Sequence, residues 1–181
     1  MLDVEDEETG SPLVPLSCAY INSSRNATDF ILNVFRRAES GSLSSKQIWD
    51  DGRCWEVWRG VGAELYGVLD HLHSTDADEA HVRADAIWQN VEKWLSEGCR
   101  EVAVILGAAA VVIDIDVFRD MKRAVSRARI LSENADSLSA RVRGLALTTL
   151  GDALRCAEDV GPAEIAYRDA LAAWPTDDSV D

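Results

Sequence analysis

The chain has 181 residues, of which 47% are hydrophobic, and a formal net charge of −14. This length and apolar content suit one compact domain, and the charge disfavours general affinity for nucleic acid and for anionic membranes. The four cysteines form no C-x-x-C pair, which is typical of reduced thiols rather than of a zinc or redox motif. The first eight residues are acidic, unlike a secretory signal. We therefore expect a cytoplasmic protein.

The first half of the sequence predicts an acidic tail followed by helices. The tail covers residues 1–16 and contains two prolines. Asn26 or Thr28 is expected to cap a first helix that ends at Gly41. Apolar residues at alternating steps of three and four over 55–72 predict the next helix.

The middle of the chain holds one segment whose secondary structure is ambiguous. A helix over 80–95, ended by Gly98, precedes it. The valines and isoleucines of 102–113 favour a strand, whereas the alanines favour a buried helix. We interpret this segment as a helix, because no partner strand is evident elsewhere. It is also shorter than the roughly 20 residues that a membrane-spanning helix needs.

Three further helices are predicted, over about 117–131, 137–158 and 162–174. Asp116 is expected to cap the first of them, and Pro162 is a favourable first-turn residue for the last. Together the elements predict an all-α domain over 17–176, with a short acidic tail at 177–181.

All three histidines lie within residues 70–81: His71, His73 and His81. On a helix, His71 and His73 point about 200° away from each other, which disfavours a shared metal ion. Histidines at one helix end and acids at the start of the next complement the helix dipoles without a metal. We expect no cofactor, and no nucleophile motif indicates catalysis. The alternative is a helical enzyme or small-ligand sensor that uses these histidines and the tryptophan-rich hairpin over 49–94.

One helix carries an unusual concentration of basic residues: Arg119, Lys122, Arg123, Arg127 and Arg129. On a helical wheel they oppose the apolar face. A solvated face is the ordinary explanation. The functional alternative is a docking surface for an acidic segment, either residues 3–8 of this chain or an acidic partner.

Residues 144–177 resemble a tetratricopeptide repeat, a helix–turn–helix unit of about 34 residues. The matching positions are Leu147, Leu150, Gly151, Leu154, Ala163, Tyr167, Ala170 and Pro175. Gly151 is expected to let the paired helices touch closely. Residues 102–135 fit the same frame more weakly. The resemblance implies antiparallel helical hairpins stacked as a short right-handed solenoid.

The resemblance also implies a function. Repeats of this family usually bind peptide segments of other proteins in the groove lined by their first helices. Carried over to this chain, the groove-facing positions are Leu145, Thr148, Asp152, Arg155 and Cys156. The resemblance thus implies a non-catalytic adaptor, chaperone or regulatory subunit that binds a partner's helix or peptide. Self-association through unfinished repeat ends is a further expectation; nucleic acid and membranes are not expected partners.

Overall fold

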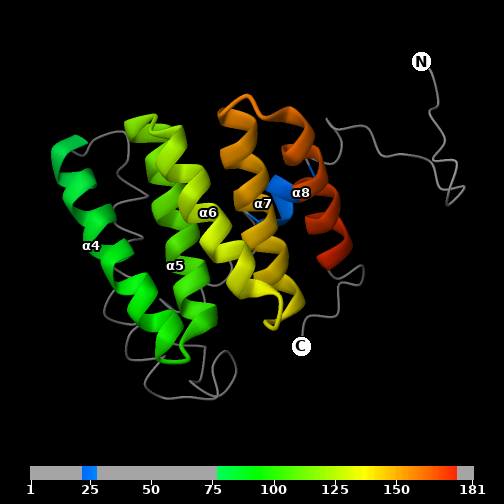
Figure 1. Ribbon diagram of the computed structural model, residues 1–181, viewed down its shortest axis with the longest axis horizontal. Helices are drawn as coiled ribbons and strands as arrows, with labels where there is room; N and C mark the ends of the chain where they lie inside the picture. Colours follow the sequence, from blue (N-terminus) through cyan, green and yellow to red (C-terminus); the bar gives the residue numbers. More distant parts are fainter. Residues whose placement is uncertain (1–21, 28–76, 175–181) are drawn as a thin grey trace, which may run out of the picture.

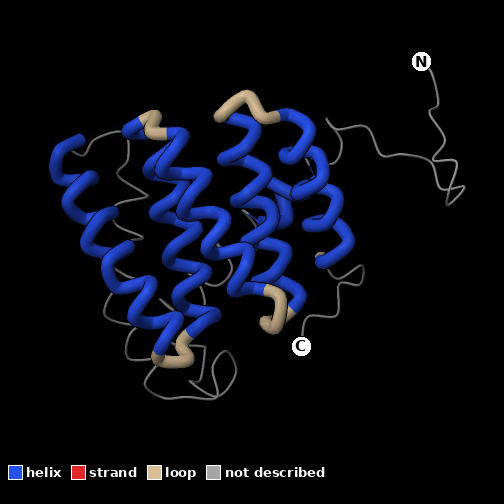
Figure 2. The backbone as a smooth tube through the Cα atoms, viewed as in Figure 1, coloured by secondary structure: helices blue, strands red, loops and turns tan. Residues whose placement is uncertain are grey.

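The computed structural model describes residues 22–27 and 77–174, and every structural statement below concerns these ranges. Residues 22–27 are helical. The remaining elements are α4 (Ala77–Ser96), α5 (Arg100–Ile113), η1 (Asp114–Phe118), α6 (Met121–Ala135), α7 (Ala140–Cys156) and α8 (Val160–Ala173). These ranges contain no strand (Figure 2), so the all-α prediction is confirmed for the described part of the chain.

The helices stand side by side from α4 at one end to α8 at the other, each reversing the direction of the one before (Figure 1). α5 packs on α4, α6 and α7, and α7 packs on α5, α6 and α8. The helical segment 22–27 lies against α7. Because α5 and α7 touch most of the other helices, they form the centre of the fold.

α5 is a helix that is apolar on all sides. Nearly all of its side chains from Val102 to Ile113 are buried, since α4, α6 and α7 surround it. Gly107 lets one neighbour come close: a Cβ at this position would lie 2.7 Å from Cδ2 of Leu131. The helical interpretation of 102–113 is therefore confirmed.

The connection from α5 to α6 differs from the prediction. The chain continues beyond Ile113 as the π-helix η1, which Arg119 ends in a left-handed conformation with φ of 52°. Asp120 then caps α6, because its carboxylate accepts a hydrogen bond from the backbone N–H of Arg123 at 3.1 Å. The predicted cap at Asp116 is wrong, since that residue lies inside η1.

α7 and α8 form a hairpin in which two glycines admit aromatic rings. A Cβ at Gly151 would lie 2.5 Å from Cε1 of Tyr167, and one at Gly144 would lie 2.7 Å from Cε2 of Trp174. Both rings are buried. The predicted close contact of the paired helices at Gly151 is thus confirmed.

The other predicted boundaries fall close to those observed. Gly98, with φ of 88°, follows the end of α4 as predicted. Asn26 lies inside the helical segment 22–27, so its predicted role as a cap is wrong. The predicted tails, the helix over 55–72 and most of the tryptophan-rich hairpin lie outside the described residues. No described helix is both long enough and apolar enough to cross a bilayer.

Candidate functional site

One face of α7 carries Thr148 and Asp152, one turn apart, and the segment 22–27 covers it. Oγ of Ser23 lies 2.5 Å from Oγ1 of Thr148. The Thr148 hydroxyl donates to the Gly144 carbonyl at 2.8 Å. The Thr148 hydroxyl thus lies within hydrogen-bond distance of both the Gly144 carbonyl and Ser23, and either hydroxyl of the Ser23–Thr148 pair can be the donor.

Asp152 is the second acceptor on this face. Its Oδ1 accepts from the Tyr167 hydroxyl at 2.7 Å and from Oγ of Ser24 at 3.4 Å. Burial raises the pKa of the Asp152 carboxyl, and these hydrogen bonds together with the Arg155 charge oppose the shift. Nε of Arg155 donates to the Tyr167 oxygen at 3.3 Å. Burial, followed by the charge of Asp152, raises the pKa of Tyr167.

The predicted groove positions differ in how accessible they are. Leu145 is 1% exposed and belongs to the hydrophobic core, so its side chain is not accessible in this structure. Thr148 is equally buried, against Ser23. Asp152 and Cys156 are half-buried, and Arg155 is exposed. The structure therefore brings Thr148, Asp152 and Arg155 together, through Tyr167 and the segment 22–27.

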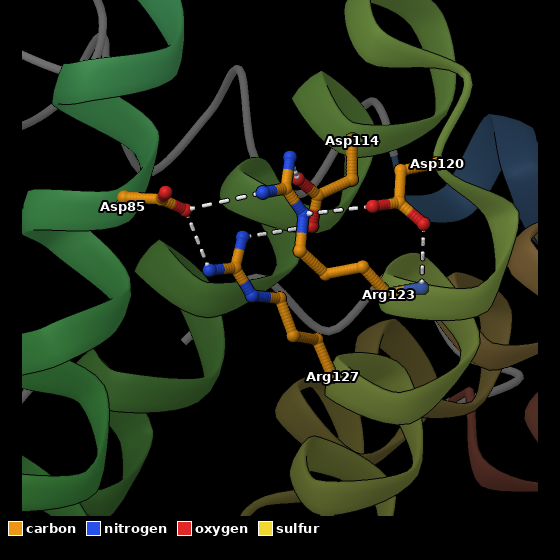
Figure 3. Close-up of polar contacts among 5 residues, drawn as sticks. All are labelled: Asp85, Asp114, Asp120, Arg123 and Arg127. Atoms are coloured by element: carbon orange, nitrogen blue, oxygen red, sulfur yellow. Dashed lines mark hydrogen bonds and ion pairs between the residues drawn. The ribbon is translucent and has the colours of Figure 1, made fainter.

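A second polar cluster joins α4, η1 and α6 (Figure 3). Asp114 is fully buried at its centre. Arg123 Nη2 lies 2.7 Å from Asp114 Oδ1, and Arg127 Nη1 lies 2.8 Å from Asp114 Oδ2. Arg127 Nη2 also reaches Asp85 Oδ1 at 2.8 Å, and its guanidinium lies 4.8 Å from the centre of the Trp88 ring. Asp120 Oδ2 lies 3.7 Å from Arg123 Nε (Figure 3), so three carboxylates surround the two guanidinium groups.

This cluster holds helices together rather than recruiting an anion. Burial raises the pKa of Asp114, whereas Arg127 and Arg123 lower it. Arg127 is 8% exposed, so the interpretation of the basic residues as one solvated face is wrong at that position. With Arg123 and Arg127 committed to carboxylates, the exposed members of the predicted basic surface are Arg119, Lys122 and Arg129.

Sequence reasoning missed the role of Asp114, although a signal was present. Asp114 is the first charged residue after the apolar run of α5. A carboxylate that follows such a run inside a helix is buried with it, and a buried carboxylate requires cationic partners. No local pattern, in contrast, marks Ser23 as a contact of Thr148, because 125 positions separate the two residues.

An open pocket of about 820 Å³ lies between α6 and the end of α7. Its lining residues are Met121, Lys122, Val125, Ser126, Arg129, Ile130, Leu154, Cys156, Ala157, Glu158 and Asp159. Two basic side chains face two acidic ones, so the pocket has no net charge. Burial raises the pKa of the Cys156 thiol, which disfavours a thiolate nucleophile.

Among the histidines and cysteines, the described residues include His81, Cys99 and Cys156. His71 and His73 lie outside the described residues, and His81 belongs to α4. Within the described ranges, no group of three or more histidine, cysteine or acidic residues is arranged to hold a metal ion. Cys99 is disulfide-bonded, so the prediction of reduced thiols is wrong at that residue; Cys156 is free.

The contact of the segment 22–27 with α7 is the candidate functional site. It brings together Thr148 and Asp152, two of the predicted groove positions, and Arg155 is joined to them through Tyr167. No protein-family model, curated protein or solved structure matches this chain.

Proposed function

We propose that the protein is a non-catalytic interaction module that binds a short helix or peptide of another protein on the α7 face at Thr148 and Asp152. The observation that supports this function is the docking of the chain's own segment 22–27 on that face. A surface that seats one short helix through side-chain hydrogen bonds offers the geometry needed to seat another.

The order of helix packing supports a repeat-like form of this module. If α5–α6 and α7–α8 are successive hairpins, the first helix of each contacts the first helix of the other, and α6 contacts α7. Such nearest-neighbour packing is typical of helical solenoids. We therefore propose tetratricopeptide-like stacking with the binding face on α7. The glycine that admits Tyr167 between paired helices supports the same proposal.

The module would act as an adaptor, chaperone or regulatory subunit, and a second copy of the chain is a candidate partner. We also propose a cytoplasmic location, which follows from the acidic sequence.

Affinity capture with two matched variants tests this function. Arg155→Glu reverses an exposed charge beside Tyr167 and Asp152. Arg143→Glu makes the same change at an exposed position of the same helix, about 120° away around its axis. We expect wild type and Arg143→Glu to retain the same proteins, and Arg155→Glu to lose them while its circular dichroism spectrum is unchanged. An identical set on all three baits would exclude the α7 face.

A further inference from the structure

The contacts of the segment 22–27 define what the α7 face selects. Ser23 is fully buried, and Ala27, one turn further on, is 7% exposed. The segment therefore presents a face of small side chains to the rest of the fold. A close approach of this kind is open only to residues with short side chains, since a longer one would hold the two backbones apart.

The polarity of the face adds a second condition. The Thr148 hydroxyl lies within hydrogen-bond distance of both the Gly144 carbonyl and Ser23, and Oδ1 of Asp152 accepts from Tyr167 and from Ser24. The occupant therefore needs two hydroxyl groups, one to pair with the Thr148 hydroxyl and one to donate to the Asp152 carboxylate. Two successive serines, Ser23 and Ser24, supply them.

We propose that residues 22–27 are a built-in competitor, and that the partner of the α7 face is a helix with two successive serine or threonine residues followed, one turn after the first, by alanine or glycine. This inference rests on the proposed function and names its partner class. The tethered segment is present at a high effective concentration, so it holds the face closed against weak ligands. The apparent affinity for a partner equals its intrinsic affinity multiplied by the fraction of molecules in which the segment has left the face.

A peptide-binding experiment on the full chain tests this competitor. The probe is a fluorescein-labelled synthetic peptide with the sequence of residues 19–31, AYINSSRNATDFI. Ser23→Glu places a larger, charged side chain at the buried contact with Thr148, so it should expel the segment while the sequence of α7 stays unchanged. Asn22→Glu makes the same charge change at an exposed position of the same segment.

We expect the peptide to bind Ser23→Glu about tenfold or more tightly than it binds wild type or Asn22→Glu, because the competitor has been removed. A peptide that itself carries Ser23→Glu should not bind. Equal affinity for Ser23→Glu and wild type would overturn the proposal. So would a Ser23→Glu protein that does not fold, because a segment that must leave before a partner binds cannot be required for folding.

The peptide-binding experiment and the affinity-capture experiment can fail independently of each other. If the peptide fails to bind Ser23→Glu while Arg155→Glu still loses its captured proteins, the α7 face binds partners of another chemistry. If Arg155→Glu changes nothing while the peptide binds as expected, the contact serves only the chain itself.

Discussion

The two halves of the described fold bring helices together by opposite means. In the half formed by α4, α5, η1 and α6, a buried carboxylate at Asp114 draws in two guanidinium groups. In the α7–α8 hairpin, the missing side chain of Gly151 admits the ring of Tyr167. The first half depends on balanced buried charges and the second on the fit of a ring against a glycine. Removing a charge and adding a methyl group should therefore lower the stability of the two halves by different amounts.

The charge-based half is the more sensitive to loss of one partner. Taking Asp114 out of water has a desolvation cost that the two guanidinium groups offset. Removing the carboxylate would leave the cations buried without that compensation. The shape-based half carries no such risk, but it tolerates no added volume at the contact.

The largest expected effect comes from Asp114→Ala. This substitution should lower the free energy of unfolding by about 3–5 kcal/mol, because Arg127 remains buried after it has lost one of its two carboxylate partners. Urea unfolding followed by circular dichroism measures it. Asp136→Ala is the control, since it breaks an exposed ion pair with Arg143 and should change stability by at most about 1 kcal/mol. If both variants lose the same free energy of unfolding, the buried ion pairs of Asp114 contribute no more to stability than the exposed pair of Asp136.

A smaller effect is expected from Gly151→Ala. The added methyl group would meet Tyr167 ring atoms at 2.5–2.9 Å, and displacing a buried ring should lower the free energy of unfolding by about 1–3 kcal/mol. Gly161→Ala adds the same methyl group to α8 where nothing lies within 4 Å. That control should be neutral or stabilising by up to about 1 kcal/mol. If the two variants unfold at the same urea concentration, the contact is not tight in solution.

The smallest effect concerns the pH dependence contributed by Asp152. Burial raises its pKa above the ordinary value of 3.8, and the nearby Asp116 charge adds to the rise while Arg155 opposes it. The folded state therefore binds the proton more tightly than the unfolded chain does. The contribution of Asp152 to stability is full below the unfolded pKa and decreases as the pH rises through the raised pKa.

Asp152→Asn removes this contribution and provides the comparison. The free energy of unfolding of wild type minus that of Asp152→Asn should decrease as the pH rises above the ordinary carboxyl pKa of 3.8. Urea unfolding of both proteins across this range measures the difference, and the many exposed carboxylates cancel between them. A difference that rises with pH would show that the hydrogen bonds to Asp152 outweigh its burial.

Local sequence patterns predicted the helices and one close contact. Periodic apolar positions located α4 and α6, whereas α5 was assigned as a helix because no partner strand was evident. Repeat-like spacing singled out Gly151, because a glycine where two helices meet has a local consequence. The local pattern led to Asp116 rather than Asp120 as the cap of α6, since both are competent cap residues. The choice depends on the π-helix and on the buried arginines, which are tertiary features.

Pairings between distant parts of the chain lay beyond sequence reasoning. Arg127 meets Asp85 across 42 positions, and Ser23 meets Thr148 across 125. Neither of these sequence separations corresponds to a periodic pattern in the sequence. The sequence also predicted that the basic residues from Arg119 to Arg129 form one surface. That grouping was wrong, because Arg123 and Arg127 pair with carboxylates of η1 and α4, which the local pattern does not show.

The ring of Trp174 on Gly144 has a consequence for how the end of the fold opens. Terminal helices ordinarily fray, and their last amides exchange with solvent quickly. Here the residue that follows α8 is anchored on the first turns of α7, so the two ends of the hairpin are tied to each other. The final turn of α8 can unwind only if the Trp174 ring leaves its contact with Gly144. This turn should therefore open together with the whole hairpin as one cooperative unit.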